Sequence, residues 1–353
     1  MAIFQPIFAS ILKDSFQILE NIPFRKGTKP AGLSKLQKDF SIVIPTRNRR
    51  EDLNRLLSSI ANQTLLPKEI IVVDDSDDNE TRILTEHQNT DFQNKKVQLK
   101  YMRGDQKNRS ISAARNIGAR KSNGSIICFL DDDAILDKNY LEEIASVFET
   151  QTTAIGVQGY IVNYRTDSIF SNALNRVCYG FPRDYFEPNK CTAFPFVYPQ
   201  PLTKLIECQW CVGANSSYQK DILKDFRFDE NLAGYSLCED LDLSVRLLNR
   251  YPHSLFMTPY AKLVHRGSPC GRVSKEKFFS ILVQNTTYFF YKNVAQNLRN
   301  NIVFYWGFFI GRFVLRFAYH DAEGTILLAK AVFKTLKNFD SVKVCANFKP
   351  KIE

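Results

Sequence analysis

The sequence predicts an α/β protein with a mainly parallel sheet flanked by helices, followed by a helical C-terminal extension. Short runs of Val, Ile and Leu alternate with amphipathic segments between residues 40 and 150, an order typical of a parallel sheet covered on both faces. Three aspartates, Asp131-Asp132-Asp133, directly follow one apolar run, and ligands bind at the carboxyl ends of strands in such sheets.

The expected elements follow in chain order. Ser41 to Ile44 predicts a short buried strand that Pro45 stops, and residues 50–62 predict a helix with leucine and isoleucine on one face. Further strands are expected at residues 69–73, 98–102 and 126–130, and further helices at 80–87, 111–121 and 138–149. Asn123-Gly124 is a typical stop for the helix over 111–121.

Three regions are predicted along the chain: an N-terminal amphipathic leader and connector over 1–39, a compact α/β domain over 40–275, and a helical, aromatic and basic region over 276–353. Residues 162–208 are irregular and rich in aromatics and proline, which favours a lid or an elaboration on the substrate side. Residues 210–270 return to compact order, and a short strand near residue 264 precedes His265.

Composition limits the partners. The net charge of +10 favours anionic ones: nucleotides or an acidic membrane surface. Nucleic acid is not expected, because the basic residues are spread along the chain without an arginine-rich arm or finger motif. Met1 to Leu12 lacks the basic start of a secretory signal, and the scattered cysteines are interpreted as free thiols, so a cytoplasmic location is expected.

The first two candidate site elements follow predicted strands. The loop Pro45-Thr46-Arg47-Asn48-Arg49 offers hydroxyl, amide and guanidinium donors for a base and its phosphates, and an ordinary exposed turn is the alternative. Asp75 follows the second strand and could accept from a base N–H or a ribose hydroxyl. A solvated helix entry capped by Asp or Ser is the alternative there.

The aspartate triplet is the strongest single signal. Three adjacent carboxylates are costly unless a cation or solvent relieves them, so Asp133 is expected to ligate Mg²⁺ or Mn²⁺. Asp131 or Asp132 would then hold a ribose or a metal-bound water. An EF-hand loop fits poorly because Leu136 stands where glycine is needed, and helix capping accounts for one aspartate only.

Two later elements complete the set. Glu239 and Asp240 open a helix, where a carboxylate can serve as a general base or merely interact with the helix dipole. His265 follows a strand, and a metal or phosphate role stands beside a purely structural one. The chain has no GxGxxG, GxxxxGK[ST], HExxH or GxSxG motif, which excludes the enzyme classes that depend on them.

The ordered set of motifs resembles the family-two glycosyltransferases of the GT-A fold. The matching segments are Phe40-Ser-Ile-Val-Ile-Pro-Thr-Arg-Asn-Arg49, Ile70-Ile-Val-Val-Asp-Asp-Ser76, Ala113-Ala-Arg-Asn-Ile-Gly118, Phe129-Leu-Asp-Asp-Asp133, Gly213-Ala-Asn-Ser216, Phe228-Asp-Glu230 and Glu239-Asp-Leu-Asp-Leu243. They extend from Phe40 to near Pro269. Ala134 departs from the pattern, which often has an acidic or aromatic residue after the third aspartate, and no processive QxxRW-type signature is present.

The resemblance implies a seven-strand-type mixed sheet that binds a nucleotide-sugar, and a residue-by-residue assignment. Asp240 would be the catalytic base, and Asp133 and His265 would lie at the metal. The nucleotide side would comprise Pro45, Thr46, Arg47, Asn48, Arg49, Asp75, Arg115, Asp131 and Asp132, and the acceptor side Trp210, Gly213, Asn215 and Glu239.

The predicted function is inverting, metal-dependent transfer of a sugar from a nucleotide-sugar to a glycan or lipid-linked acceptor, in the synthesis of cell-envelope or extracellular polysaccharide. The pathway comes from the resemblance alone. A sugar-nucleotide nucleotidylyltransferase is one alternative, although its expected glycine-rich loop after the first strand is missing. A non-catalytic membrane-associated scaffold with a transferase-like fold is another, and the presence of both Asp133 and Asp240 argues against it.

The C-terminal region has its own alternatives. The apolar run over residues 302–311 is too short to span a bilayer, and Arg312 and Arg316 follow it. Aromatics with interleaved arginines favour a helix in the membrane interface, at the inner face of the cell membrane. Packing on the catalytic domain or on a second copy in a homodimer remains the alternative.

Overall fold

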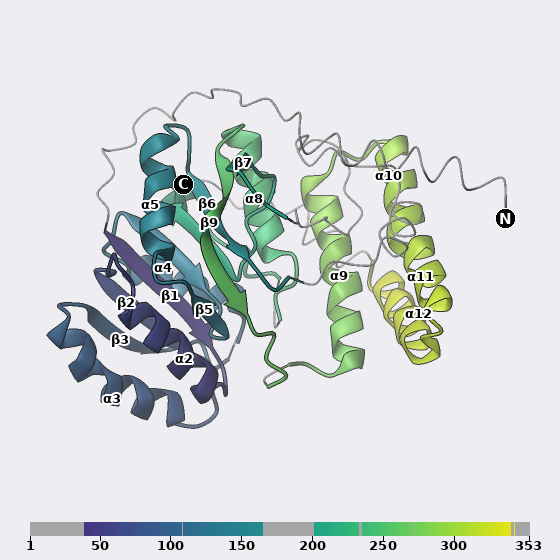
Figure 1. Ribbon diagram of the computed structural model, residues 1–353. Helices are drawn as coiled ribbons and strands as arrows, with labels where there is room; N and C mark the ends of the chain where they lie inside the picture. Colours follow the sequence, from purple (N-terminus) through teal and green to yellow (C-terminus); the bar gives the residue numbers. More distant parts are fainter. Residues whose placement is uncertain are drawn as a thin grey trace.

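The computed structural model describes residues 39–107, 109–164, 201–232, 235–270, 272–339 and 342. The leader predicted for residues 1–39 therefore lies outside the described residues except for Asp39, and most of the lid predicted over 162–208 lies outside them too. In Figure 1 a twisted sheet with its helices occupies one side of the molecule, and the helices α9 to α12 stand together on the other.

Nine described strands form one mixed sheet in the order β3-β2-β1-β4-β8-β6-β9-β5, with β7 paired to β9. The resemblance implied seven strands, and the short β5 (Ala134–Leu136) and β7 (Ile206–Glu207), both paired with β9, extend the sheet beyond that number. The mixed α/β architecture with a helical C-terminal region is confirmed.

The parallel half of the sheet consists of β1 (Phe40–Thr46), β2 (Glu69–Asp74), β3 (Gln98–Arg103) and β4 (Ile126–Leu130). The helices α2 (Arg50–Ala61), α3 (Glu80–Asn94) and α4 (Ile111–Lys121) connect them. The leucine and isoleucine face predicted for α2 is buried, as an amphipathic helix on a sheet requires. Because β1, β2 and β4 are parallel neighbours, the loops after them open at one edge.

The expectation that Pro45 stops the first strand is wrong. β1 continues through Pro45 to Thr46, and Pro45 pairs with Val73 of β2. The pairing of β1 with β4 ends at Val43, so Pro45 lies where β1 has a ladder on one side only and the missing N–H costs little.

The second half of the sheet is mixed. β8 (Asn215–Gln219) is antiparallel to both β4 and β6 (Gly156–Ile161), and β9 (Leu255–His265) is parallel to β6. Within the described part of this half, three helices accompany the strands: α5 (Tyr140–Thr150), the short α7 (Ile222–Asp225) and α8 (Glu239–Arg250). One large apolar core unites this half with the parallel half.

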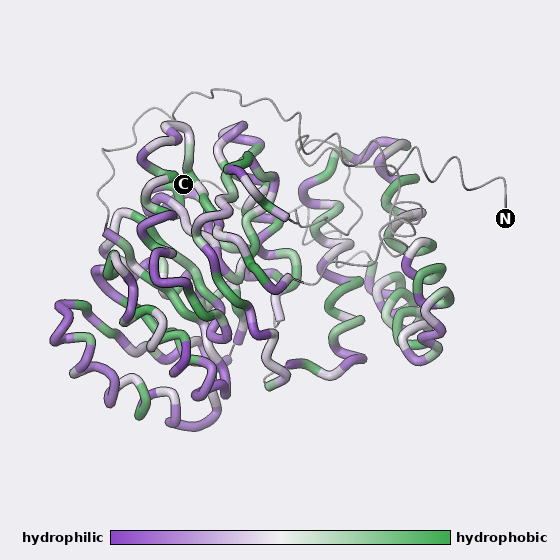
Figure 2. Tube along the Cα trace, in the orientation of Figure 1, coloured by the Kyte–Doolittle hydropathy of each residue, from purple (hydrophilic) through white to green (hydrophobic). Residues whose placement is uncertain are grey.

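The C-terminal helices are α9 (Lys275–Asn293), α10 (Leu298–Phe304), the π-helical η1 (Tyr305–Gly311), α11 (Arg312–Ala318) and α12 (Ala322–Lys337). They share a second core that includes Phe279, Phe290, Phe304 and Phe308, with the rings of Phe290 and Phe304 stacked at 3.9 Å. Figure 2 shows apolar positions running through the sheet and through these helices. Among the described helices, none combines the length and apolarity that crossing a bilayer would need.

Candidate active site

The end of β1 and the loop after it lie beside the aspartate triplet after β4. Thr46 Oγ1 donates to Asp132 Oδ2 at 2.8 Å, and Arg49 Nη1 donates to Asp132 Oδ1 at 2.9 Å. Asp132 is buried, which raises its pKa to about 7 despite the opposing charge of Arg49. Asp132 therefore anchors the loop after β1, and contact with a nucleotide stays a prediction for this residue.

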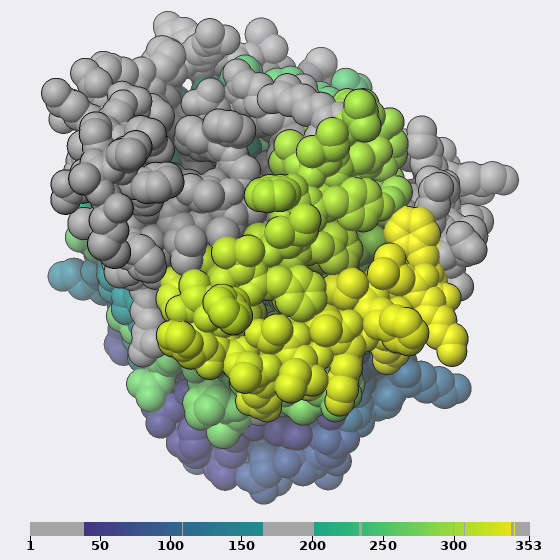
Figure 3. Space-filling view, turned by 90° about the vertical axis from the view of Figure 1, so that its right-hand side faces the viewer, coloured from purple at the N-terminus to yellow at the C-terminus, as the bar shows by residue number. Residues whose placement is uncertain are grey.

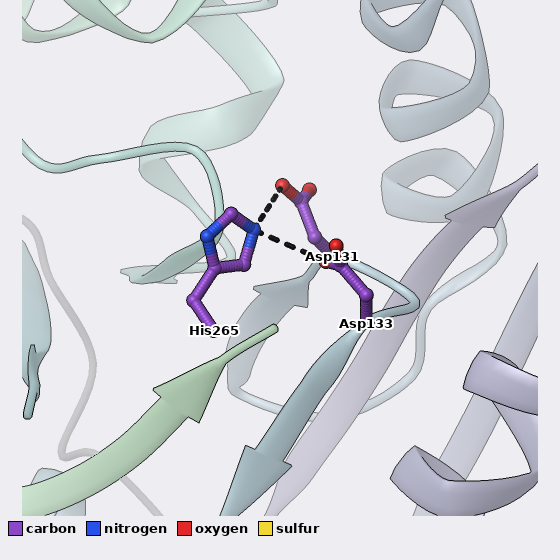
Figure 4. Close-up of side chains that lie close together, drawn as sticks. All are labelled: Asp131, Asp133 and His265. Atoms are coloured by element: carbon purple, nitrogen blue, oxygen red, sulfur yellow. Dashed lines mark ion pairs between the residues drawn. The ribbon is translucent and has the colours of Figure 1, made fainter. Parts of the chain in front are cut away.

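Asp131, Asp133 and His265 form a compact group of potential metal ligands (Figure 4). Their ligand atoms all lie within 4.8 Å of one another, with His265 Nε2 at 3.1 Å from Asp133 Oδ1 and 3.7 Å from Asp131 Oδ2. Strand pairing explains the meeting, because antiparallel β5 and β9 place Ala134 opposite His265. Two carboxylates and an imidazole suit a divalent cation of the Mg²⁺ or Mn²⁺ type.

The electrostatics of this group keep its carboxylates ionised. Burial would raise the pKa of Asp133, but the hydrogen bonds from His265 and from the Ser268 N–H, together with the Arg49 charge, bring it to about 2. The pKa of Asp131 is also lowered: burial is outweighed by His265 and Arg115. Hydrogen bonds to the two aspartates raise the pKa of His265 to about 10. Both carboxylates are thus in the charged form that a metal ligand needs.

Arg115 connects this group to the acidic start of α8. Its side chain is 2% exposed, and it donates from Nη1 to Glu239 Oε1 at 2.5 Å and from Nη2 to Asp131 Oδ1 and to the Gly213 carbonyl, both at 3.0 Å. A Cβ on Gly213 would lie 2.7 Å from Arg115 Nη1, so the guanidinium requires glycine there. The two acidic segments therefore share one charged network.

Asp240 is the accessible carboxylate at this second end. It is partly exposed, whereas Glu239 is buried against Arg115. The Gly213 N–H donates to Asp240 Oδ2 at 2.9 Å, and the Leu241 N–H donates to Oδ1 at 2.8 Å. Burial outweighs these hydrogen bonds and raises the pKa of Asp240. Burial and the neighbouring Asp240 charge also raise the pKa of Glu239, to about 8, against the pull of Arg115.

The two aspartates at the end of β2 have separate roles. Asp74 is fully buried and accepts from the Ser76 N–H at 2.9 Å and from the Tyr101 hydroxyl at 2.9 Å. Asp75 Oδ1 is buried without a hydrogen-bond partner among the described residues, and burial raises the pKa of Asp75 to about 6. Gly104 packs so closely on it that a Cβ there would lie 2.0 Å from this oxygen. An unsatisfied acceptor at a strand end is what a base N–H would complete.

The remaining loop residues join the first loop to the second. Asn48 has a positive φ of 54°, its N–H donates to Ser76 Oγ at 2.8 Å, and its Oδ1 accepts from the Asp77 N–H at 3.2 Å. Arg47 is exposed and lies 3.6 Å from Asp77. Pro45 belongs to β1 itself. These residues lie at the same edge of the sheet as Asp75, whose Oδ1 has no hydrogen-bond partner among the described residues.

The other residues predicted on the acceptor side lie just before β8 and at its start. The Trp210 side chain interacts with Asp240 and helps to lower its pKa against burial. Gln158 Nε2 donates to the Trp210 carbonyl at 2.7 Å. Asn215 is fully buried, and its Nδ2 donates to the Gly159 carbonyl at 3.0 Å. This hydrogen bond fixes the start of β8, two residues after Gly213. Contact of Asn215 or Glu239 with an acceptor stays a prediction.

Sequence reasoning missed the loop after β9. The Arg266 N–H donates to the Asp133 carbonyl at 3.0 Å, and the Ser268 N–H donates to Asp133 Oδ2 at 2.7 Å. Arg49 Nε donates to the Cys270 carbonyl at 2.7 Å. These contacts use backbone atoms of the loop, so no residue type in the sequence could have signalled them.

Comparisons with known proteins give a family match. The model of the family described as glycosyl transferase family 2 matches residues 41–226. The chain is 26% identical over 197 residues to the minor teichoic acid biosynthesis protein GgaB of Bacillus subtilis, covering 55% of this chain and 19% of that protein. It is 31% identical over 112 residues to the poly(ribitol-phosphate) beta-N-acetylglucosaminyltransferase TarP of Staphylococcus aureus, covering 30% of this chain and 32% of that protein.

Solved structures share the fold. The mannosyltransferase PcManGT from Pyrobaculum calidifontis, solved with GDP-Man and Mn²⁺, has a TM-score of 0.56 at 14% identity, covering 98% of this chain and 94% of that one. S. aureus TarS 1–349, solved with UDP-GlcNAc, has a TM-score of 0.50 at 19% identity, covering 83% and 79%. The chain spans 19% to 51% of the length of the first two curated relatives it matches.

Proposed function

Because the chain belongs to glycosyl transferase family 2, we propose that it transfers a sugar from a nucleotide-sugar to an acceptor hydroxyl with inversion at the anomeric carbon and with the help of a divalent cation. One observation supports the proposal above the others. Arg115 contacts both Asp131 at the metal-ligand group and Glu239 beside Asp240, so the two acidic segments belong to one site.

The donor side uses the edge formed by the loops after β1 and β2. The unpaired Asp75 Oδ1 accepts an N–H of the base, and the loop from Thr46 to Arg49 borders the nucleoside and its phosphates. Arg49 is held by Asp132 and by the Cys270 carbonyl, so it offers positive charge at a defined place. Such preorganised charge favours the transition state, in which negative charge grows on the departing diphosphate.

Asp131, Asp133 and His265 would hold the cation, Mg²⁺ or Mn²⁺. When bound, the cation neutralises the diphosphate and makes it a better leaving group. The side chains of Asp131 and His265 are each 32% exposed, so a ligand can reach them from solvent. The orientation of Asp133 is fixed by the hydrogen bond from the Ser268 N–H.

Asp240 acts as the general base. Its raised pKa makes it a better proton acceptor than an ordinary aspartate, and its two backbone hydrogen bonds fix its orientation. It takes the proton of the acceptor hydroxyl as the hydroxyl oxygen bonds to the anomeric carbon and the bond to the diphosphate breaks. A single direct displacement of this kind inverts the anomeric configuration.

The acceptor is a glycan or a lipid-linked glycan on the cytoplasmic side of the cell envelope. The names of two relatives support a cell-envelope acceptor, since one is a teichoic acid biosynthesis protein and the other a poly(ribitol-phosphate) beta-N-acetylglucosaminyltransferase. Trp210 and Gly213 lie against Asp240 and are therefore the residues that would border the acceptor.

A thermal-shift panel tests the donor assignment. The full chain is heated with nucleoside diphosphates and nucleotide-sugars, each with and without Mn²⁺, and a bound donor raises the melting temperature. We expect one nucleotide-sugar to stand out and its shift to need Mn²⁺. Stabilisation by a nucleoside triphosphate, with release of pyrophosphate from that triphosphate when a sugar phosphate is added, would instead support a nucleotidylyltransferase.

A further inference from the structure

The helical rod formed by α10, η1 and α11 has an apolar outer face. The apolar residues of this face recur every three or four residues along the chain, and each is at least 45% exposed. This spacing places them along one side of a helix. We call them the outer stripe; they are Leu298, Ile302, Trp306, Ile310, Val314 and Phe317.

The outer stripe is additional to the face that the fold uses. Phe304 and Phe308 point the other way, into the core shared with α9 and α12, and are 1% and 0% exposed. A helix that is apolar on both sides normally has a partner on each, and an extended apolar surface on a soluble protein marks a binding site. Figure 3 looks onto α10, α11 and α12, which together form much of this side of the molecule.

The neighbouring helix α12 adds positive charge. Phe333 and Leu336 are 72% and 55% exposed, and Lys330, Lys334 and Lys337 are exposed between and beside them. These lysines form no ion pair with a described residue. Both acidic residues of the segment 298–339 are already paired, Asp321 with Arg316 at 2.5 Å and Glu323 with Lys275 at 2.5 Å. The surface is thus apolar and basic together.

We propose that the outer stripe and the three lysines of α12 dock on an anionic lipid bilayer, with the α10–η1–α11 rod lying in the plane of the interface. Apolar side chains enter the acyl boundary, the exposed Trp306 and Tyr305 sit at headgroup level, and the lysines contact anionic headgroups. The docking is independent of the proposed reaction, so either can fail alone.

Charge selects the bilayer over two other occupants. A symmetric dimer through this face would bring its own lysines together, which like charges disfavour. Residues 1–38 carry six basic and two acidic side chains, so their net charge does not complement the lysines either. An anionic lipid surface complements both the apolar stripe and the lysines.

Vesicle flotation tests the proposal with the full chain. Vesicles of phosphatidylcholine alone are compared with an equimolar mixture of phosphatidylcholine and phosphatidylglycerol, and binding is expected only to the mixture. The triple variant Lys330→Gln/Lys334→Gln/Lys337→Gln should weaken binding on the order of 100-fold, since each lysine near an anionic surface contributes roughly fivefold. Ile302→Ser/Phe317→Ser should weaken it by at least about tenfold through lost apolar burial.

A matched control removes three exposed lysines from the sheet-bearing part, Lys95→Gln/Lys121→Gln/Lys138→Gln, and should bind like the parent. Circular dichroism and melting temperature check that each variant is folded. Absence of binding, or binding that survives both sets of substitutions, overturns the proposal. Self-association in sedimentation velocity that Ile302→Ser/Phe317→Ser abolishes, without vesicle binding, would assign the face to a second copy instead.

Discussion

The two acidic ends of the site contain the same kind of side chain in opposite electrostatic states. At the β4 end, the pKa values of Asp131 and Asp133 are lowered by His265 and by nearby arginines. At the α8 end, those of Glu239 and Asp240 are raised, because burial, joined at Glu239 by the charge of Asp240, outweighs the help from Arg115 and the backbone. A carboxylate with a low pKa suits a cation, and one with a raised pKa suits a proton.

The difference shows that the neighbours of a carboxylate, and not its residue type, determine whether it suits a cation or a proton. His265 serves only the first end, whereas Arg115 contacts both. If this division is correct, substitutions at the two ends should fail in different measurements.

Asp240→Asn should produce the largest effect. We expect kcat to fall by about 10²–10⁴-fold, because a general base contributes that much and the amide cannot accept the proton. The nucleotide dissociation constant should change little, since Asp240 does not belong to the donor side. Calorimetry and a transfer assay measure the two quantities; normal turnover would remove Asp240 from the role of base.

Arg115→Met should lower the free energy of unfolding by about 3–5 kcal/mol, because it leaves the buried Glu239 and the partly exposed Asp131 without the guanidinium that both contact. The double variant Arg115→Met/Glu239→Gln should recover part of that loss, since it removes one of those partners. Urea unfolding measures both. A double variant as unstable as the sum of its single variants would show that the pair is not coupled.

Asp133→Ala should weaken Mn²⁺-dependent nucleotide binding on the order of 100-fold, in the range seen when the support of a metal site is lost. Binding without Mn²⁺ should change much less. Asp91→Ala, at an exposed aspartate of α3 outside the site, is the matched control. An unchanged ratio of affinities with and without Mn²⁺ would separate Asp133 from the cation.

The last prediction concerns pH. The folded pKa of Glu239, about 8, lies above its ordinary value of 4.5, so folding favours the protonated form. Its contribution to stability is complete below pH 4.5 and is lost as pH rises through 8. Glu239→Gln should flatten the decline of unfolding free energy in this window, leaving the part due to Asp240. Urea midpoints measured across the window check this, and an unaltered slope would contradict it.

Much of the fold could be predicted because local signals agreed with tertiary ones. α4 begins and ends where expected, at Ile111 and Lys121, since the Ser110 hydroxyl accepts from the Ala113 N–H at its start and Asn123-Gly124 follows its end. The helix predicted at 80–87 continues to Asn94, because a polar surface stretch gives no periodic signal for its last turns. Pro45 was misjudged because its tolerance depends on where the ladder with β4 ends.

The sequence predicted which residues belong to the candidate site better than it predicted the contacts that each of them makes. The sequence favoured Asp133 and His265 as neighbours, but three identical aspartates could not reveal that Asp132 turns inward to Thr46 and Arg49 while Asp131 joins the metal-ligand group. That choice depends on the antiparallel pairing of β5 with β9, a contact between segments about 130 residues apart.

Gly213 gives the site a mechanical property. Its amide contacts Asp240 and its carbonyl contacts Arg115, so only two backbone torsions separate the hydrogen bond on the base from the one on the guanidinium. A displacement of this residue when an acceptor arrives would rotate both bonds at once. Binding of one substrate can thereby alter the hydrogen bonds beside the other substrate, without any movement of the sheet.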